Sequence, residues 1–106
     1  MTAQGDTNTL TLVVTMTMKP EAEAAFLAQA RDFIATVEAE EPGTILYVLT
    51  KHPEREHTYV WVERYRDLAA AEAHRNSPYM AETMPKIREW LAAPPEFLRL
   101  RQVLPE

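Results

Sequence analysis

The sequence contains no cysteine, only two glycines and no long apolar run. Without cysteine the protein cannot form disulfides, thiolate nucleophiles or zinc–thiolate sites. With glycine only at positions 5 and 43, the glycine-rich loops that cradle nucleotide phosphates are also absent. Every apolar run is far shorter than the roughly 18 residues that a membrane-spanning helix needs, and residues 1–9 are polar, unlike a secretory signal. We therefore expect a cytoplasmic protein that does not contact a membrane.

Positive charge is also sparse. The chain has 11 lysines and arginines against 16 acidic residues, a net charge of -5, and the basic residues form no cluster that would mark a nucleic-acid surface. A length of 106 residues with 46% hydrophobic residues suits one domain with its own core. We expect a single domain over residues 1–106, of which residues 1–8 form a polar lead-in that frays.

Alternation of apolar and polar residues predicts four strands. Their expected ranges are about 10–18, 44–51, 57–65 and 97–103. In the second strand, Ile45, Tyr47 and Leu49 should share one face. The third strand places four side chains on one face: Tyr59, Trp61, Glu63 and Tyr65.

A long helix is predicted between the first two strands, from Pro20 to about Glu40. Proline suits the first turn of a helix, because its missing N–H would be unpaired there. Pro42 and Gly43 are expected to end the helix, since the residue before proline resists the helical conformation and Gly43 can adopt a positive φ.

Two shorter helices are predicted between the third and fourth strands. Asp67 is expected to cap the first, from Leu68 to about His74, and Ser77 to cap the second. Pro85 lies inside the second helix and is expected to kink it or split it.

The resulting order of elements, β-α-β-β-α-β, predicts a ferredoxin-like α+β fold, with helices on one face of a four-stranded antiparallel sheet. The second and third strands carry large apolar side chains on both faces. One layer of helices hides only one of these faces, and an exposed apolar sheet face indicates an interaction site. We therefore expect a homodimer that packs sheet against sheet.

The sequence resembles the antibiotic biosynthesis monooxygenase family of dimeric α+β barrels. The matching stretches are Glu41-Pro42-Gly43-Thr44, Val62 to Asp67, and Glu72-Ala73-His74 followed by Ser77-Pro78-Tyr79. Element order and lengths agree over about residues 9–104. The family includes cofactor-free oxygenases of phenols and quinols, haem-degrading enzymes and an isomerase of a phosphorylated signalling sugar. The resemblance implies a cavity between the sheet and the helices of each subunit, with His74 as the motif histidine.

The same resemblance disfavours haem degradation and a cofactor. Haem-degrading members have a histidine ligand in the helix after the motif histidine and an asparagine on the first strand. Here Met84 stands at the expected ligand position, and the first strand contains no asparagine. A metal site is not expected either, because His52 and His57 flank a hairpin tip and are interpreted as residues of a solvated loop.

His74 is the sharpest candidate for catalysis, because its imidazole can take or give a proton at neutral pH. Removing a proton from a dihydroxyaromatic compound produces an electron-rich anion that can pass an electron to O2. The alternative is a structural role, in which His74 lies at a helix C-terminus where the dipole favours a cation.

Other side chains are candidates for substrate binding. Trp61 and Tyr79 could define a pocket for an aromatic ring, and Tyr47 could add a phenol hydroxyl, although such aromatic stripes are also typical of a core or an interface. Asn76 could bind a carbonyl or an oxyanion, or serve only the turn after its helix. Arg64 could pair with an anionic substrate, or equally with Glu63 or Glu72 across the surface.

We interpret the chain as a cofactor-independent monooxygenase that oxidises a small aromatic or quinol-like substrate with O2. An isomerase of a small phosphorylated metabolite is a second hypothesis. It requires inward-pointing arginines, so Arg64, Arg75 and Arg99 all at the surface would count against it. A third is a non-catalytic, small-molecule binding dimer, which a pocket filled by Trp61 and Met84 would favour.

Overall fold

The computed structural model describes residues 8–105 and contains one four-stranded antiparallel sheet in the order β2-β3-β1-β4. The elements follow the chain as β1 (Leu10–Thr17), η1 (Pro20–Ala22), α2 (Glu23–Glu40), β2 (Thr44–Lys51), β3 (Thr58–Tyr65), α3 (Leu68–Arg75), α4 (Pro78–Trp90) and β4 (Glu96–Arg101). The expected lead-in is residues 1–8, and residues 1–7 of it lie outside the described residues. Within the described residues, no helix is both long and apolar enough to cross a membrane.

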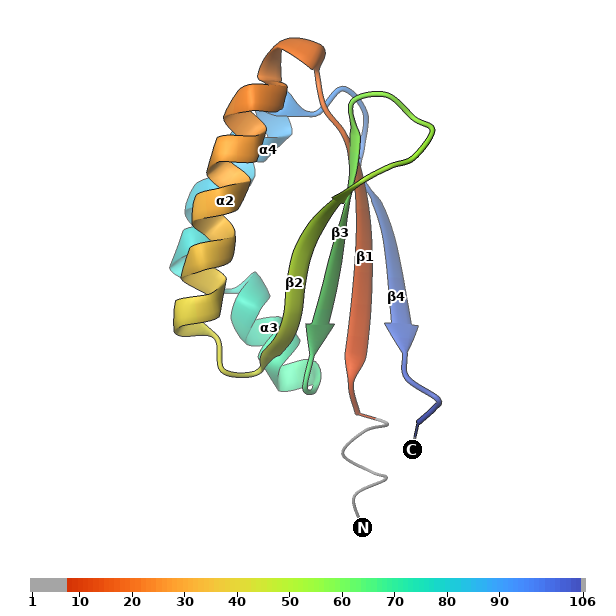
Figure 1. Ribbon diagram of the computed structural model, residues 1–106. Helices are drawn as coiled ribbons and strands as arrows, with labels where there is room; N and C mark the ends of the chain where they lie inside the picture. The colour runs from red at the N-terminus through yellow and green to blue at the C-terminus, as the bar shows by residue number, and fades with distance from the viewer. Residues whose placement is uncertain (1–7, 106) are drawn as a thin grey trace.

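The helices of residues 8–105 lie together on one face of the sheet, and none of these described helices covers the other face (Figure 1). The predicted ferredoxin-like α+β fold is therefore confirmed. β1 and β3 are the central strands and pair with each other, so that Trp61 lies opposite Val14. The core lies between the helical face of the sheet and α2. Its largest contributions come from Val14, Met16, Tyr47, Tyr59 and Trp61 on the strands and from Phe26, Phe33 and Val37 on α2.

The strands begin and end within two residues of the predicted ranges, with the fourth ending at Arg101 instead of Val103, and one position of β2 occupies a different face from the one predicted. The pairing of β2 with β3 shifts between Thr44 and Leu46, and Ile45 lies in this irregularity with 55% of its surface exposed. Ile45 therefore does not share the buried face of Tyr47. The shift adds one residue to β2 that has no partner on β3, and this interrupts the strict alternation of side chains.

Both predicted caps of the short helices are confirmed. The Asp67 side chain accepts a hydrogen bond from the N–H of Ala70 at 2.9 Å, and the Ser77 hydroxyl accepts one from the N–H of Met80 at 3.3 Å. Pro85 does not split α4, which continues from Pro78 to Trp90. A proline removes only one backbone hydrogen bond of a helix, and the packing of buried Thr83 and Ile87 holds the residues on both sides of it in place.

Gly43 connects α2 to β2 and does not have the positive φ that was expected of it. Its role is to let two segments approach each other. A Cβ atom at position 43 would lie 2.7 Å from the Cβ of Ala70 in α3. The carbonyl of Gly43 also accepts a hydrogen bond from the N–H of Arg66 at 2.8 Å. The end of α2 is therefore held directly against the start of α3.

Replacing Gly43 with alanine is expected to destabilise the fold by about 1–3 kcal/mol, as for other insertions into a packed interior. The cause is the steric overlap with Ala70, so the double variant G43A/A70G should recover most of the loss. Thermal unfolding of the wild type, the two single variants and the double variant measures this coupling. Additive effects of the two substitutions would contradict the packing argument.

Candidate functional site

A cavity of about 690 Å³ lies between the sheet and the helices. Small-molecule sites commonly enclose roughly 300–1,000 Å³. Every strand contributes to its lining, as do α2, α3 and α4. The apolar part of the lining includes Leu10, Leu12, Val14, Met16, Ala30, Phe33, Trp61, Met80, Met84 and Ile87. The cavity therefore has the size and the apolar walls that suit one small aromatic molecule.

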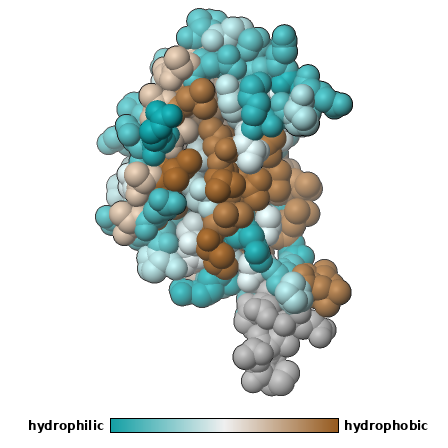
Figure 2. All heavy atoms as spheres, in the orientation of Figure 1, coloured by the Kyte–Doolittle hydropathy of each residue, from teal (hydrophilic) through white to brown (hydrophobic). Residues whose placement is uncertain are grey.

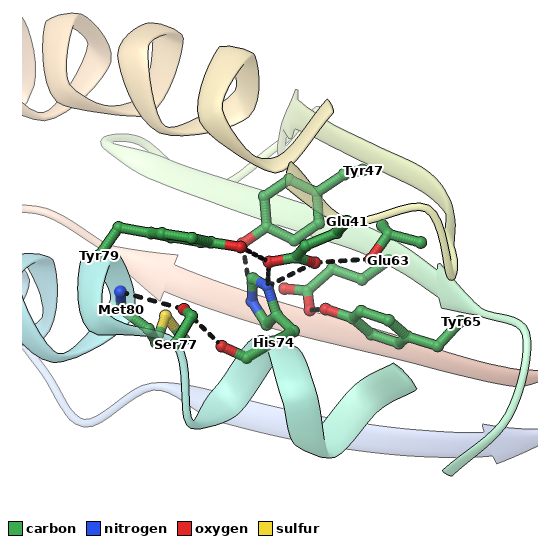
Figure 3. Close-up of polar contacts among 9 residues, drawn as sticks. Glu41, Tyr47, Glu63, Tyr65, His74, Ser77, Tyr79 and Met80 are labelled. Atoms are coloured by element: carbon green, nitrogen blue, oxygen red, sulfur yellow. Dashed lines mark hydrogen bonds and ion pairs between the residues drawn. The ribbon is translucent and has the colours of Figure 1, made fainter. Parts of the chain in front are cut away.

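His74 lines this cavity from the last turn of α3, and only 3% of it is exposed. Its Nδ1 lies 2.9 Å from the Glu41 carboxylate, and its Nε2 lies 3.4 Å from the Tyr47 hydroxyl (Figure 3). The Ser77 hydroxyl donates to the His74 carbonyl at 2.8 Å, which fixes the end of α3. The imidazole is thus held by partners on both of its nitrogens.

Glu41 is the residue that orients this imidazole, and its side chain is nearly buried. It is the C-cap of α2, and three donors converge on its carboxylate: the hydroxyl of Thr44 at 2.6 Å, the hydroxyl of Tyr79, and Nδ1 of His74 (Figure 3). An ionised carboxylate only accepts hydrogen bonds, so Nδ1 must carry a proton. In the neutral ring, Nε2 then carries the lone pair that can accept a proton.

Aromatic rings surround His74 on several sides. The ring of Tyr47 is 5.1 Å from the imidazole and 5.1 Å from the ring of Trp61, measured between centroids. Phe33 meets the imidazole edge-on at 5.9 Å, and Tyr65 lies 5.5 Å from it. These rings keep water from the buried side of His74 and hold its orientation.

Glu63 is a second buried carboxyl group, on the face of β3 that meets the cavity, and 5% of it is exposed. One of its oxygens accepts a hydrogen bond from the Tyr65 hydroxyl at 2.5 Å. Burial raises the pKa of Glu63, although the hydrogen bond from Tyr65 and the nearby His74 oppose the shift. The idea that Glu63 pairs with Arg64 across the surface is wrong, because neighbouring residues of a strand point to opposite faces.

The tyrosines of the site are hydrogen-bond donors. Burial raises the pKa of Tyr47 and of Tyr65 far above the ordinary value. Burial, helped by the hydrogen bond to Glu41, raises the pKa of Tyr79 to about 12. All three phenols are therefore protonated at neutral pH, and none can act as a base there.

The structure places some of the residues predicted to bind substrate at the cavity and others away from it. Trp61 and Tyr47 line the cavity beside His74. Tyr79 does not line it, and its hydroxyl instead donates to Glu41. Arg64 lies on the opposite face of β3 and donates to Gln102, and Asn76 is an exposed C-cap of α3. Arg64 and Asn76 therefore lie away from the cavity and from any molecule inside it.

Sequence reasoning missed Glu41 and Glu63. The signal for Glu63 was present, because strand alternation placed it on the same face as Trp61. For Glu41 the only signal was its place in the motif that precedes β2. It falls outside the apolar stripe of α2, which consists of Phe26, Ala30, Phe33 and Val37.

Other ionisable groups are used structurally. His52 Nδ1 accepts hydrogen bonds from the backbone N–H groups of Glu54 and Arg55, at 3.1 and 3.0 Å. His57 pairs with Glu23 at 3.1 Å. Across residues 8–105, no group of three or more histidine, cysteine, aspartate or glutamate side chains is arranged to hold a metal ion. The chemistry of the cavity therefore centres on a histidine–carboxylate pair, a separate carboxyl group and a phenol.

The chain is similar to known proteins over most of its length. The model of the family "Antibiotic biosynthesis monooxygenase" matches residues 9–86. The "Putative monooxygenase YcnE" of Bacillus subtilis (strain 168) is 32% identical over 82 residues, which cover 77% of this chain and 85% of the relative.

Solved structures agree with this similarity. The crystal structure of a putative antibiotic biosynthesis monooxygenase from Caulobacter crescentus CB15 superimposes with a TM-score of 0.88 at 25% identity, over 96% of each chain. A conserved protein from Methanosarcina mazei Go1 superimposes with a TM-score of 0.86 at 21% identity, over 94% of this chain and 98% of that one. The second similarity concerns the fold alone.

Proposed function

This chain belongs to the antibiotic biosynthesis monooxygenase family, and on that premise we propose that it is a cofactor-independent monooxygenase of a small aromatic or quinol-like substrate. The observation that carries the proposal is the buried Glu41–His74 pair at the wall of an apolar cavity. The pair supplies an oriented base, and the cavity supplies a site with little water for a planar molecule.

In the proposed mechanism, Nε2 of His74 accepts a proton from a substrate hydroxyl. The resulting anion passes an electron to O2, and the two radicals combine to form a carbon–oxygen bond. Glu41 stabilises the imidazolium that forms, because its carboxylate lies 2.9 Å from Nδ1. Trp61 forms a wall for the ring, and Tyr47 can donate a hydrogen bond to a substrate oxygen.

The reaction needs no external reductant. One dihydroxybenzene and one O2 give one hydroxyquinone and one water, so that the substrate supplies all four electrons that O2 takes up. One oxygen atom enters the ring. The other leaves as water with one proton from a substrate hydroxyl and one from the ring carbon that is oxidised. This balance is the reason that a site built only from side chains is sufficient.

Oxygen uptake tests the proposal. We expect the purified protein to consume O2 with at least one member of a panel of dihydroxybenzenes, dihydroxynaphthalenes and anthrones, at one O2 per substrate molecule. Heat-denatured protein is the control for spontaneous oxidation. Uptake at the rate of that control with every compound would contradict the proposal.

A second candidate function has one observation in its favour. Arg75 and Arg99 line the cavity, which an isomerase of a phosphorylated metabolite would require, whereas Arg64 lies on the other face of the sheet. Such an activity would proceed without O2 and with a phosphosugar as substrate. Trp61 and Met84 line the cavity rather than fill it, so the feature that would favour a non-catalytic binding protein is missing.

We also propose that a second copy of the chain covers the face of the sheet that the helices leave open. Four apolar side chains in register cross this face from edge to edge: Val48, Val62, Val13 and Leu98. At the two edge strands, Val48 is 38% and Leu98 is 55% exposed. Figure 2 shows hydrophobic side chains gathered over the strands, with hydrophilic ones above them. A homodimer would remove this surface from water.

Replacing Val62 with lysine at the centre of this row is expected to shift the protein from dimer to monomer, because the charge would be buried between two apolar sheets. Ala35→Lys on the exposed side of α2 is the matched control. Sedimentation equilibrium at micromolar concentration measures the change. A wild-type protein that is already monomeric under these conditions would contradict the proposed dimer.

A further inference from the structure

Glu63 has no role in the mechanism described so far, although it faces the same cavity as His74. Among the described residues that line the cavity, it is the only carboxylic acid. It is separate from the Glu41–His74 pair, since His74 Nδ1 is bonded to Glu41. The cavity therefore brings together two proton carriers with different partners.

The surroundings of Glu63 favour its protonated form. It is 5% exposed, its lone hydrogen-bonding partner among the described residues is the Tyr65 hydroxyl, and no described lysine or arginine forms an ion pair with it. A carboxyl group buried without a cationic partner tends to keep its proton. A neutral carboxylic acid in a dry site can act as a general acid at neutral pH, as in other enzymes that hold two carboxyl groups in unlike environments.

We propose that Glu63 is the general acid that protonates the departing oxygen when the O–O bond of the substrate hydroperoxide breaks. This inference rests on the proposed monooxygenase function. The hydroperoxide forms when the oxygenated substrate anion takes back the proton held by His74, and His74 is then neutral again. Breaking the O–O bond requires both a base and an acid, and the cavity contains one of each.

Cleavage of the hydroperoxide transfers two protons and one electron pair. His74 takes the proton from the carbon that bears the hydroperoxide, and the electron pair of that C–H bond becomes the second bond of a new carbonyl group. The O–O bond breaks, and the outer oxygen leaves with its electron pair as hydroxide, which takes the Glu63 proton to become water. His74 then returns its proton to Glu63, so both residues regain their starting states.

Loss of the acid should change the products rather than merely the rate. Without a proton donor, a hydroxide ion would have to leave into an apolar cavity, which is strongly unfavourable. The competing path loses the whole hydroperoxide as H2O2, so that one dihydroxybenzene and one O2 give one quinone and one H2O2. The ratio of hydroxyquinone to H2O2 therefore reports the acid directly.

Glu63→Gln is the test variant, because glutamine keeps the shape and can still accept the hydrogen bond from Tyr65. We expect it to fold. Because the pKa of Glu63 is raised in the folded state, the folded protein binds this proton more tightly than the unfolded chain does. The free energy of unfolding therefore falls as the pH rises from the ordinary pKa of the group to its folded pKa, and this loss is absent below the ordinary pKa. The variant should be at least as stable as the wild type at neutral pH, and its advantage should shrink as the pH is lowered.

The experiment measures O2 uptake, H2O2 release and hydroxyquinone yield in parallel, with the dihydroxybenzene that the wild type uses best. A positioned general acid commonly contributes about 10²–10⁴-fold, so the ratio of hydroxyquinone to H2O2 should fall at least about tenfold in Glu63→Gln. Glu23→Gln is the matched control: Glu23 also accepts a hydrogen bond from a tyrosine, Tyr59, at 3.1 Å, but does not line the cavity. Its product ratio should equal that of the wild type.

The results separate the two proposals. A Glu63→Gln variant that forms hydroxyquinone without extra H2O2 would overturn the role of Glu63 and leave the monooxygenase function intact. A wild-type protein that consumes no O2, or that releases one H2O2 for each O2, would instead overturn the proposed function, and the role of Glu63 with it.

Discussion

Replacing His74 with alanine is expected to lower kcat/KM for the dihydroxyaromatic substrate by about 10²–10⁴-fold, the usual contribution of a positioned base. The physical reason is that the other ionisable groups described around the imidazole do not replace it as a base. Tyr47, Tyr65 and Tyr79 are protonated at neutral pH, and burial raises the pKa of Glu63, which favours its protonated form. Removal of the buried imidazole also leaves a space beside Tyr47 that an added imidazole could enter.

That space allows a control that distinguishes loss of the base from loss of structure. Free imidazole should restore part of the O2 uptake of His74→Ala, whereas it should not affect the wild type. His52→Ala is the matched variant, because His52 is a histidine of the β2–β3 hairpin whose Nδ1 only accepts backbone hydrogen bonds. Undiminished turnover of a folded His74→Ala protein would remove His74 from the mechanism.

Replacing Glu41 with glutamine is expected to lower kcat by about 10²-fold with little change in KM, because Glu41 does not line the cavity and acts through His74. The amide is neutral, so it cannot stabilise the imidazolium. It can also present an N–H group to Nδ1, which would force the proton onto Nε2 and abolish the base.

Two variants separate this effect from a general loss of structure. Glu38→Gln changes an exposed carboxylate of the same helix and should have no effect on kcat. Tyr79→Phe removes one of the three donors to Glu41 and should have a smaller effect than Glu41→Gln. An increase of KM at constant kcat in Glu41→Gln would show that Glu41 shapes the cavity and does not position the base.

Much of the fold could be predicted because its signals are local. Strand alternation, the caps at Asp67 and Ser77 and the apolar stripe of α2 depend only on neighbours in the sequence. The exceptions depend on tertiary packing. Gly43 is a glycine because Ala70, which is distant in the sequence, lies against it. Ile45 leaves the buried face because the register of β2 shifts against β3.

The site was less predictable for the same reason. Periodicity cannot reveal that Glu41, at the end of one helix, meets His74, at the end of another. Tyr79 follows His74 closely in the sequence, and only the direction of α4 determines that its hydroxyl reaches Glu41 instead of the cavity. Glu63 could have been found, because alternation separated it from Arg64. Because Glu63 is an acidic residue, it was assigned to the surface, and its burial contradicts that assignment.

The central claim is that one atom of O2 enters the substrate. Turnover under ¹⁸O2, followed by mass spectrometry of the product and of the water formed, tests it most directly. The account predicts one labelled oxygen atom in each hydroxyquinone molecule and the other in water. An oxidised product without label, with both labelled atoms recovered as H2O2, would contradict it, because the protein would then remove only electrons and protons from its substrate.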